Sequence, residues 1–95
     1  MLGDRTFEAL RHSERRRILE LLQQKGELAA GELAEYFDFS KPTLSHHLKL
    51  LVDAGLLDKE RRGQFIYYRI NMSVAEEVVH AIANMLAPKR RRRPA

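Results

Sequence analysis

The chain has 95 residues, of which 44% are hydrophobic and 32% are charged, and it contains no cysteine. This length and balance fit one soluble globular domain, and the lack of cysteine excludes disulfides and thiolate metal sites. No apolar run approaches the roughly 20 residues that span a bilayer. The first residues of the chain also lack the apolar segment of a signal peptide. We therefore expect a cytoplasmic location without membrane insertion.

The charge of the chain is basic and partly clustered. Lysine and arginine number 17 against 13 aspartates and glutamates, which gives a net charge of +4, and residues 89–93 are all basic. Clustered basic charge favours a polyanionic partner, which is nucleic acid or, as a weaker alternative, an anionic membrane. We expect one domain over residues 1–88 and a basic, disordered tail over residues 89–95.

Two helices are predicted at the start of the chain. Residues 6–12 form a short helix with Phe7 and Leu10 on one side. Ser13 is the expected N-cap of a second helix, in which apolar residues recur at helical spacing until Gly26 ends it. A brief extended connection follows.

The next segment predicts a helix-turn-helix. Residues 30–37 form a helix, residues 38–40 a tight turn, and Ser40 caps a second helix that runs to about residue 54. Gly55 supplies a left-handed stop. Two short helices joined in this way can place the second one in the major groove of DNA.

The second helix of this unit has two different faces. Its inward residues, at i, i+3, i+4 and i+7, are Leu44, His47, Leu48 and Leu51. Its outward residues are Pro42, Thr43, Ser45, His46 and Lys49. The outward face is short, polar and free of carboxylates until Asp53, so it can approach phosphates and base edges without repulsion. A polar face alone favours a solvated helix, but its place in a helix-turn-helix of a basic chain, followed by a basic hairpin, favours DNA binding.

A β-hairpin is predicted after Gly55, because the hydrophobic period changes from helical to alternating. Residues 57–62 and 65–70 form the strands, and Gly63 with Gln64 forms the turn. Basic side chains surround the tip, at Lys59, Arg61 and Arg62. They can contact phosphates or a narrow minor groove, or they can protect a sheet edge from aggregation.

A last helix is predicted from a capping box at Ser73 and Glu76 to about Pro88. Its apolar side chains cover more of the helix surface than one small domain can bury, which favours a homodimer. The predicted dimerisation residues are Phe7, Leu10, Val74, Val78, Val79, Ile82, Met85 and Leu86.

The order of elements predicts a mostly α-helical fold with a small β-hairpin, a homodimeric winged helix-turn-helix. The predicted DNA-binding residues are Ser40, Lys41, Pro42, Thr43, Ser45, His46, Lys49, Arg61, Arg62 and Gln64. Among them, Thr43, Ser45 and His46 are expected to reach base edges, whereas the lysines and arginines are expected to contact phosphates. The expected partner is double-stranded DNA.

Three segments resemble the ArsR family of bacterial repressors. They are SKPTLSHHLKLL at 40–51, AGLL at 54–57 and RGQFIYY at 62–68, and Arg15 and Arg16 match paired arginines of the family. The resemblance spans residues 7–86 and is strongest to metal-independent autorepressors of the sporulation-delaying type. It implies a homodimer built from the first and last helices, with the recognition helix and the wing on DNA.

Other functions fit the sequence less well. Cysteines that serve metal sensors of the family are absent at residues 32–35, and the last helix offers only Glu76, Glu77 and His80, so we expect no metal and no cofactor. The serines lack a base and an orienting group, which argues against an enzyme. The alternative is a winged helix that binds protein or RNA. The sequence leaves open an inducer or a protein partner.

Overall fold

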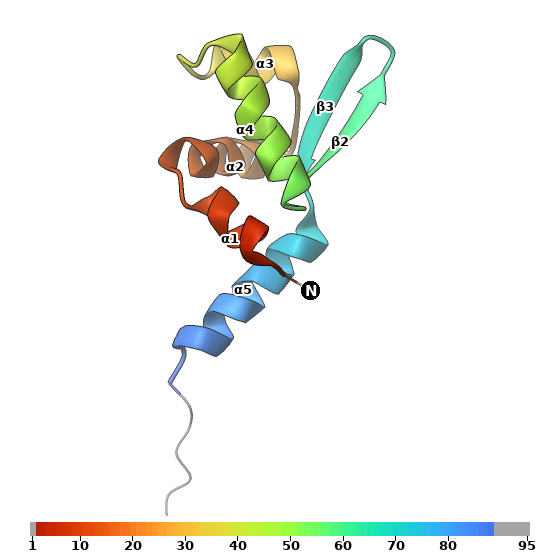
Figure 1. Cartoon of the computed structure of the whole chain (residues 1–95). Coiled ribbons are helices and arrows are strands. Elements are labelled where there is room, and N and C mark those ends of the chain that lie inside the picture. Colours follow the sequence, from red (N-terminus) through yellow and green to blue (C-terminus); the bar gives the residue numbers. More distant parts are fainter. Residues whose placement is uncertain (1, 89–95) are drawn as a thin grey trace, which may run out of the picture.

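The computed structural model describes residues 2–88; Met1 and residues 89–95, which include the predicted basic tail, lie outside the described range. The elements are α1 (Asp4–Leu10), α2 (Ser13–Lys25), β1 (Glu27–Ala29), α3 (Ala30–Glu35), α4 (Lys41–Asp53), β2 (Leu57–Arg62), β3 (Phe65–Ile70) and α5 (Met72–Leu86). Helices α1 to α4 form a body, the β2–β3 hairpin stands beside α4, and α5 extends away from the body (Figure 1). Within the described part, no helix combines the length and apolarity needed to cross a bilayer.

The strands form a three-stranded antiparallel sheet in the order β1-β3-β2. The predicted hairpin is confirmed, and Gly63 adopts φ 63° in its turn, as a short hairpin loop requires. The predicted extended connection after α2 is the additional strand β1, in which Leu28 pairs with Tyr68. With helices before and after it, this sheet completes a winged helix-turn-helix.

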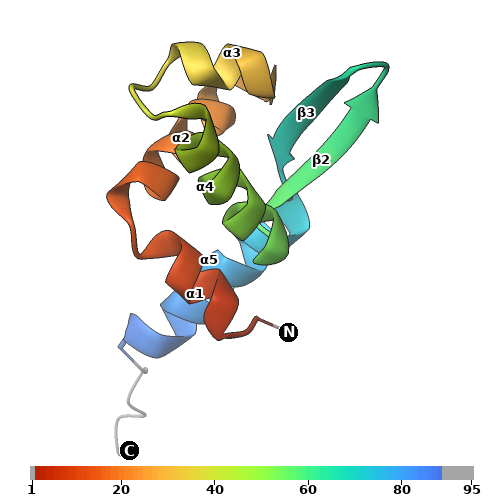
Figure 2. The same cartoon turned by 45° about the horizontal axis from the view of Figure 1, so that its top comes forward.

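The core lies between α2, α4 and one face of the sheet. Its fully buried side chains are Ile18, Leu22, Leu33, Leu51 and Leu57. Leu44, Leu48 and Leu51 are the buried residues of α4, which confirms its predicted inward face. An apolar row therefore fixes α4 to the body, and Figure 2 shows where α4 lies among α1, α2 and the hairpin.

Two predicted helix caps are wrong. The N-cap of α2 is His12, and the hydroxyl of Ser13 instead lies 3.3 Å from a carboxylate oxygen of Glu14. Helix α5 begins at Met72, where Asn71 Oδ1 accepts a hydrogen bond from Val74 N at 3.1 Å in place of the predicted capping box. The backbone N–H of Asn71 donates to Leu56 O, which continues the pairing of β2 and β3 by one residue and fixes Asn71 where α5 begins.

The connection between α3 and α4 is longer than predicted. Helix α3 ends at Glu35 rather than at residue 37, so the turn covers residues 36–40. The rings of Phe37 and Phe39 stack there with their centroids 5.0 Å apart, and both pack against the core. Because both rings pack against the core, residues 37 and 39 do not continue helix α3.

The joint between α1 and α2 is held by the paired arginines. Helix α1 runs from Asp4 to Leu10 rather than over residues 6–12, and at its end only Glu8 O accepts a backbone hydrogen bond within residues 2–88, from the N–H of Arg11. Arg15, which is only 4% exposed, donates to Ala9 O at 2.8 Å and Glu8 O at 3.1 Å. Arg16 donates to Leu10 O at 2.7 Å, on the exposed side of the same joint.

We predict that Arg15→Met lowers the free energy of unfolding by about 2 kcal/mol or more, because it leaves buried carbonyls without a charged donor. Arg16→Met is the matched control and should cost about 0.5 kcal/mol, since water can replace an exposed donor. Urea unfolding of both variants measures the difference. Equal losses would contradict a special role for the buried guanidinium.

Candidate nucleic-acid interface

The first turn of α4 is fixed by its N-cap. Ser40 Oγ accepts from the backbone N–H of Thr43 at 3.3 Å, and its own hydroxyl donates to Thr43 Oγ1 at 2.9 Å. Pro42 lies in the same turn, where a missing N–H costs no intrahelical bond. The predicted cap is therefore confirmed, and the hydroxyl of Thr43 can still donate outward.

The outward face of α4 carries the predicted polar residues, all exposed. They are Lys41, Pro42, Thr43, Ser45, His46 and Lys49. Lys49 Nζ lies 2.7 Å from Asp53 Oδ2, and this hydrogen bond holds the pKa of Asp53 below its ordinary value. Exposed pairs of this kind contribute little to stability, so Lys49 can exchange the carboxylate for a phosphate at little cost.

The two consecutive histidines point to different surroundings. His46 is exposed, whereas His47 turns its ring edge to Phe39 at a centroid distance of 5.4 Å. The Nδ1 atom of His47 is buried and has no hydrogen-bond partner among residues 2–88. Burial, and next the nearby Arg15 cation, lower the pKa of His47, while Glu14 opposes the shift.

The far end of α4 is attached to α1. Thr6 is buried, and its hydroxyl donates to the carbonyl of Ala54, the C-cap of α4, at 3.1 Å. Sequence analysis missed this contact because the two residues lie 48 positions apart and no local pattern marks them. The recognition helix is thus held at both ends.

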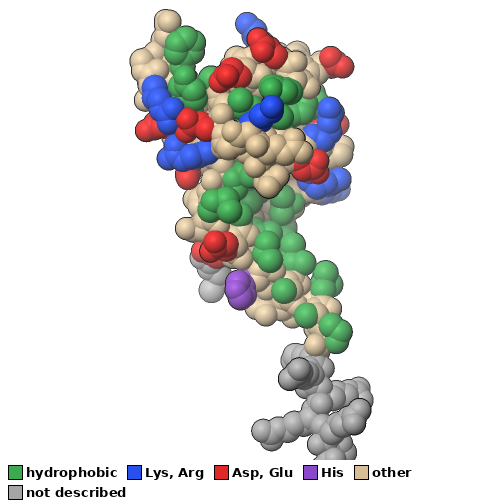
Figure 3. Space-filling view, turned by 180° about the vertical axis from the view of Figure 1, so that it is seen from behind, with side chains coloured by type: hydrophobic (Ala, Val, Ile, Leu, Met, Phe, Trp, Pro, Cys, Tyr) green, Lys and Arg blue, Asp and Glu red, His purple; other side chains and the backbone are tan. Residues whose placement is uncertain are grey.

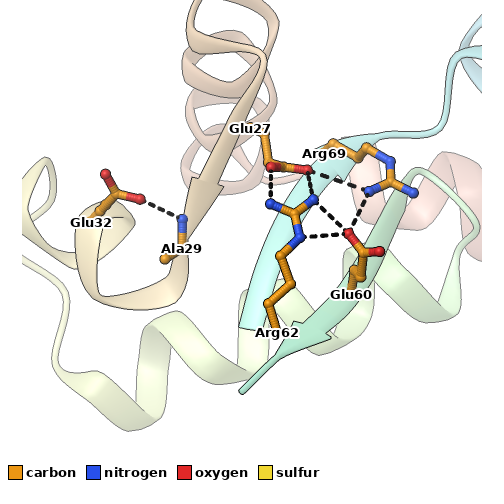
Figure 4. Close-up of polar contacts among 6 residues, drawn as sticks. All are labelled: Glu27, Ala29, Glu32, Glu60, Arg62 and Arg69. Atoms are coloured by element: carbon orange, nitrogen blue, oxygen red, sulfur yellow. Dashed lines mark hydrogen bonds and ion pairs between the residues drawn. The ribbon is translucent and has the colours of Figure 1, made fainter. Parts of the chain in front are cut away.

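The hairpin tip carries Arg61, Arg62 and Gln64, all exposed as residues. Arg61 Nε donates to Gly63 O at 3.1 Å. The guanidinium of Arg62 is bound to the carboxylates of Glu27 and Glu60 (Figure 4). The sequence predicts a phosphate contact for Arg62, and in the structure each of its three side-chain nitrogens donates to a carboxylate of this chain.

The predicted dimerisation residues fall into two groups. Val78 is 8% exposed and Val74 packs on the same core, so both stabilise the protomer itself, and Leu10 is half-buried beside them. The remaining predicted residues are exposed, at Phe7, Val79, Ile82, Met85 and Leu86. Hydrophobic side chains follow the α5 arm below the body (Figure 3).

Within the described range, no three histidine or carboxylate side chains are close enough to hold a metal ion. Glu76, Glu77 and His80 lie instead along a hollow between α5 and α1, together with Phe7 and Met85. The absence of a metal and of a cofactor stays a prediction.

Comparison with known proteins identifies the family. A family model described as bacterial regulatory protein, arsR family, matches residues 12–59. The chain is 41% identical over 80 residues to the transcriptional repressor SdpR of Bacillus subtilis, which covers 84% of this chain and 88% of that protein. The chain belongs to the arsR family. It is also 43% identical over 73 residues to an arsenical resistance operon repressor of Staphylococcus aureus, across 77% of this chain and 69% of the relative.

Solved structures of arsR-type regulators have the same fold as this family member. A crystal structure of a possible transcriptional regulator for arsenical resistance superposes with a TM-score of 0.78 at 29% identity, covering 87% of this chain and 85% of that one. The solution structure of a homodimeric winged helix-turn-helix DNA-binding domain from Mycobacterium bovis superposes with a TM-score of 0.70 at 31% identity, covering 95% and 85%. The predicted winged helix-turn-helix fold and the predicted family are both confirmed.

We predict that His47 makes the protein less stable as the pH falls from 8 to 5. Because the fold lowers the pKa of His47, the unfolded chain binds the proton first, near pH 6.5. The contribution of the neutral ring is complete above that pH and is lost below it. Urea unfolding at several pH values should show a smaller pH dependence for His47→Leu than for the wild type.

The matched control for this experiment is His46→Gln, which changes the exposed neighbour and leaves the buried ring in place. We expect it to keep the pH dependence of the wild type. A wild type whose stability rises on acidification between pH 8 and 5 would contradict the burial of a neutral His47.

Proposed function

We propose that this member of the arsR family is a transcriptional repressor that binds operator DNA as a homodimer. The observation that carries the proposal is the exposed face of α4, which is poor in carboxylates. The opposite side of this helix packs on the core, and a basic hairpin lies beside it. The relatives are repressors and regulators rather than enzymes, and this protein is likewise a regulator, not an enzyme. We propose that it acts in the cytoplasm, where bacterial DNA lies.

The residues of α4 divide into two roles in this proposal. Thr43, Ser45 and His46 have short or planar polar side chains that can reach base edges from the exposed face. Lys41 at the helix start and Lys49 further along supply phosphate contacts. Lys41 makes no ion pair within residues 2–88, so its full positive charge is available to a phosphate of the DNA backbone. Ser40 and Pro42 fix the turn that presents these side chains.

The proposed dimer uses the part of α5 that the body does not cover. Met85 and Leu86 are 65% and 76% exposed, and Val79 is 67% exposed, which is unusual for large apolar side chains on one helix. Phe7 on α1 borders the same region. The homodimeric relative from Mycobacterium bovis supports this assembly.

A two-fold dimer should read a two-fold site. We therefore expect an imperfect inverted repeat whose half-sites lie about 34–36 Å apart, one turn of DNA, or a multiple of that spacing. The alternative is a winged helix that binds protein or RNA, for which the outer face of α4 should be apolar rather than polar. An inducer or a protein partner is compatible with the same surfaces.

Dimerisation is tested with Ile82→Asp, which places a charge on the exposed apolar side of α5. Sedimentation of the wild type at micromolar concentration should give a dimer, and the variant should be monomeric with weaker operator binding, because an unpaired carboxylate cannot be buried in an interface. Phe65→Asp, at an exposed apolar position on the hairpin, is the control and should remain dimeric. A monomeric wild type would refute the proposed assembly.

Base readout is tested with His46→Ala on a duplex selected by the wild type from a random pool and on a scrambled duplex. We expect the variant to lose about 1–3 kcal/mol on the selected duplex and little on the scrambled one, because base contacts specify and phosphate contacts position. Lys41→Gln is the control and should weaken both about equally. An equal loss on both duplexes for His46→Ala would remove it from the base contacts.

A further inference from the structure

The side chain of Arg62 connects the tip of the hairpin to its base. Arg62 is the last residue of β2 and pairs with Phe65 across the turn, whereas Glu27 in β1 pairs with Arg69. Phe65 and Arg69 are four positions apart on β3, about 13 Å along the strand. The Arg62 side chain nevertheless reaches Glu27, with Nη1–Oε1 and Nη2–Oε2 distances of 2.7 and 2.8 Å.

This contact is the centre of a network that includes all three strands (Figure 4). Arg62 Nε also donates to Glu60 at 2.8 Å, and the guanidinium lies over the Tyr67 ring at 4.5 Å from its centroid. Arg69 adds ion pairs to Glu27 at 3.4 Å and to Glu60 at 3.6 Å. Two carboxylates and two guanidinium groups therefore balance one another on one face of the sheet.

The charges of this network are stable at neutral pH. Hydrogen bonds from Arg62 hold the pKa of Glu27 below its ordinary value, and hydrogen bonds to Glu27 and Glu60 raise the pKa of Arg62 further above neutrality. The pair between Arg62 and Glu27 is also bidentate, a geometry that fixes orientation as well as distance. Such a link is better suited to hold a hairpin in place than a single flexible lysine would be.

The other basic residues of the hairpin lie on the opposite face. Side chains alternate along a strand, so Lys59 and Arg61 share a face with Leu57, while Glu60 and Arg62 share the other. Leu57 is buried in the core with the inward residues of α4. Lys59 and Arg61 thus continue the sheet face that packs toward the recognition helix, and Arg62 does not.

We propose that Arg62 is a positioning residue of the wing, which ties the hairpin tip to Glu27 and so fixes the wing relative to α4, and that Arg61 and Lys59 supply its phosphate contacts. The inference rests on the proposed function as a DNA-binding regulator. A two-stranded hairpin is only marginally stable by itself, and a wing fixed before binding loses less entropy when it docks.

Competition for Arg62 supports the same division of roles. Four of the five N–H groups of Arg62 already donate to Glu27 and Glu60, so most contacts with a phosphate would replace a carboxylate contact and gain little. Arg61 makes only the hydrogen bond from Nε to the Gly63 carbonyl within the described residues, which leaves both of its Nη groups for an anion. The net gain of phosphate contact is therefore larger for Arg61.

The test compares three variants of the full chain, Arg62→Gln, Glu27→Gln and Arg61→Gln, on a duplex selected by the wild type, over a range of salt concentrations. Arg62→Gln should weaken binding about fivefold with an unchanged salt slope, as expected for losing exposed ion pairs in both protomers. Glu27→Gln should weaken binding similarly, although it adds net positive charge. Arg61→Gln should reduce the salt slope by about one per wing.

Charge reversal provides the rescue. In the free protein, Glu27→Arg with Arg62→Glu should show slower amide exchange in the hairpin than Arg62→Glu alone, because the pair is restored in the opposite sense at the net charge of the wild type. The proposal is overturned if Glu27→Gln binds more tightly than the wild type while Arg62→Gln reduces the salt slope, since Arg62 would then be a phosphate ligand.

A measurement without DNA separates this inference from the proposed function. In the free protein, amide hydrogen exchange in the β2–β3 hairpin should be faster in Arg62→Gln and Glu27→Gln than in Arg61→Gln. Equal exchange in all three variants overturns the tie, whatever the DNA result. A wild type that prefers no duplex over a scrambled one contradicts the proposed function, and the exchange data still decide whether Arg62 holds the hairpin.

Discussion

The apolar row of Leu44, Leu48 and Leu51 fixes α4 against the body, and the exposed face of this helix depends on it. The N-cap at Ser40 holds the start of the helix, and the buried Thr6 hydroxyl holds the carbonyl at its end. A helix anchored at both ends and along one side can leave its opposite side exposed. That exposed polar side is the surface that a nucleic acid can use.

The same helix depends on α1, and α1 depends on a buried charge. Arg15 occupies the carbonyls at the end of α1, so the short helix has a fixed position from which Thr6 can reach α4. A guanidinium is suited to this task because it is always charged and presents several donors in one plane. The buried cation also lies near His47, where it opposes protonation of the ring behind the recognition face.

Two cations of the candidate interface, Lys49 and Arg62, have carboxylate partners inside the chain. Lys49 is paired with Asp53, and Arg62 with Glu27 and Glu60, so the net charge overstates the charge available to DNA. These pairs differ in how easily they open. Lys49 holds one exposed contact, whereas Arg62 holds several at once and lies over an aromatic ring. On this basic surface, some cations are therefore available to bind phosphates, whereas others hold the wing in position.

Features set by neighbouring residues were predictable from the sequence alone. The inward row of α4, the Ser40 cap and the turn at Gly63 each depend on local spacing or local backbone geometry, and each is confirmed. Because these local signals occur in the right order, the winged helix-turn-helix fold was predictable as well. The apolar excess of the last helix and the polar outward face of α4 predicted the dimer and the DNA-binding roles, and the family resemblance implied the same.

Only the tertiary structure determined the contacts between distant segments. β1 is too short to show a strand period, and it exists because β3 pairs with it. A backbone bond to Leu56 O holds Asn71 at the start of α5, and Arg62 meets Glu27 across 35 positions of sequence. The sequence identifies Arg62 as a cation, but the register and twist of the sheet determine which carboxylate it contacts.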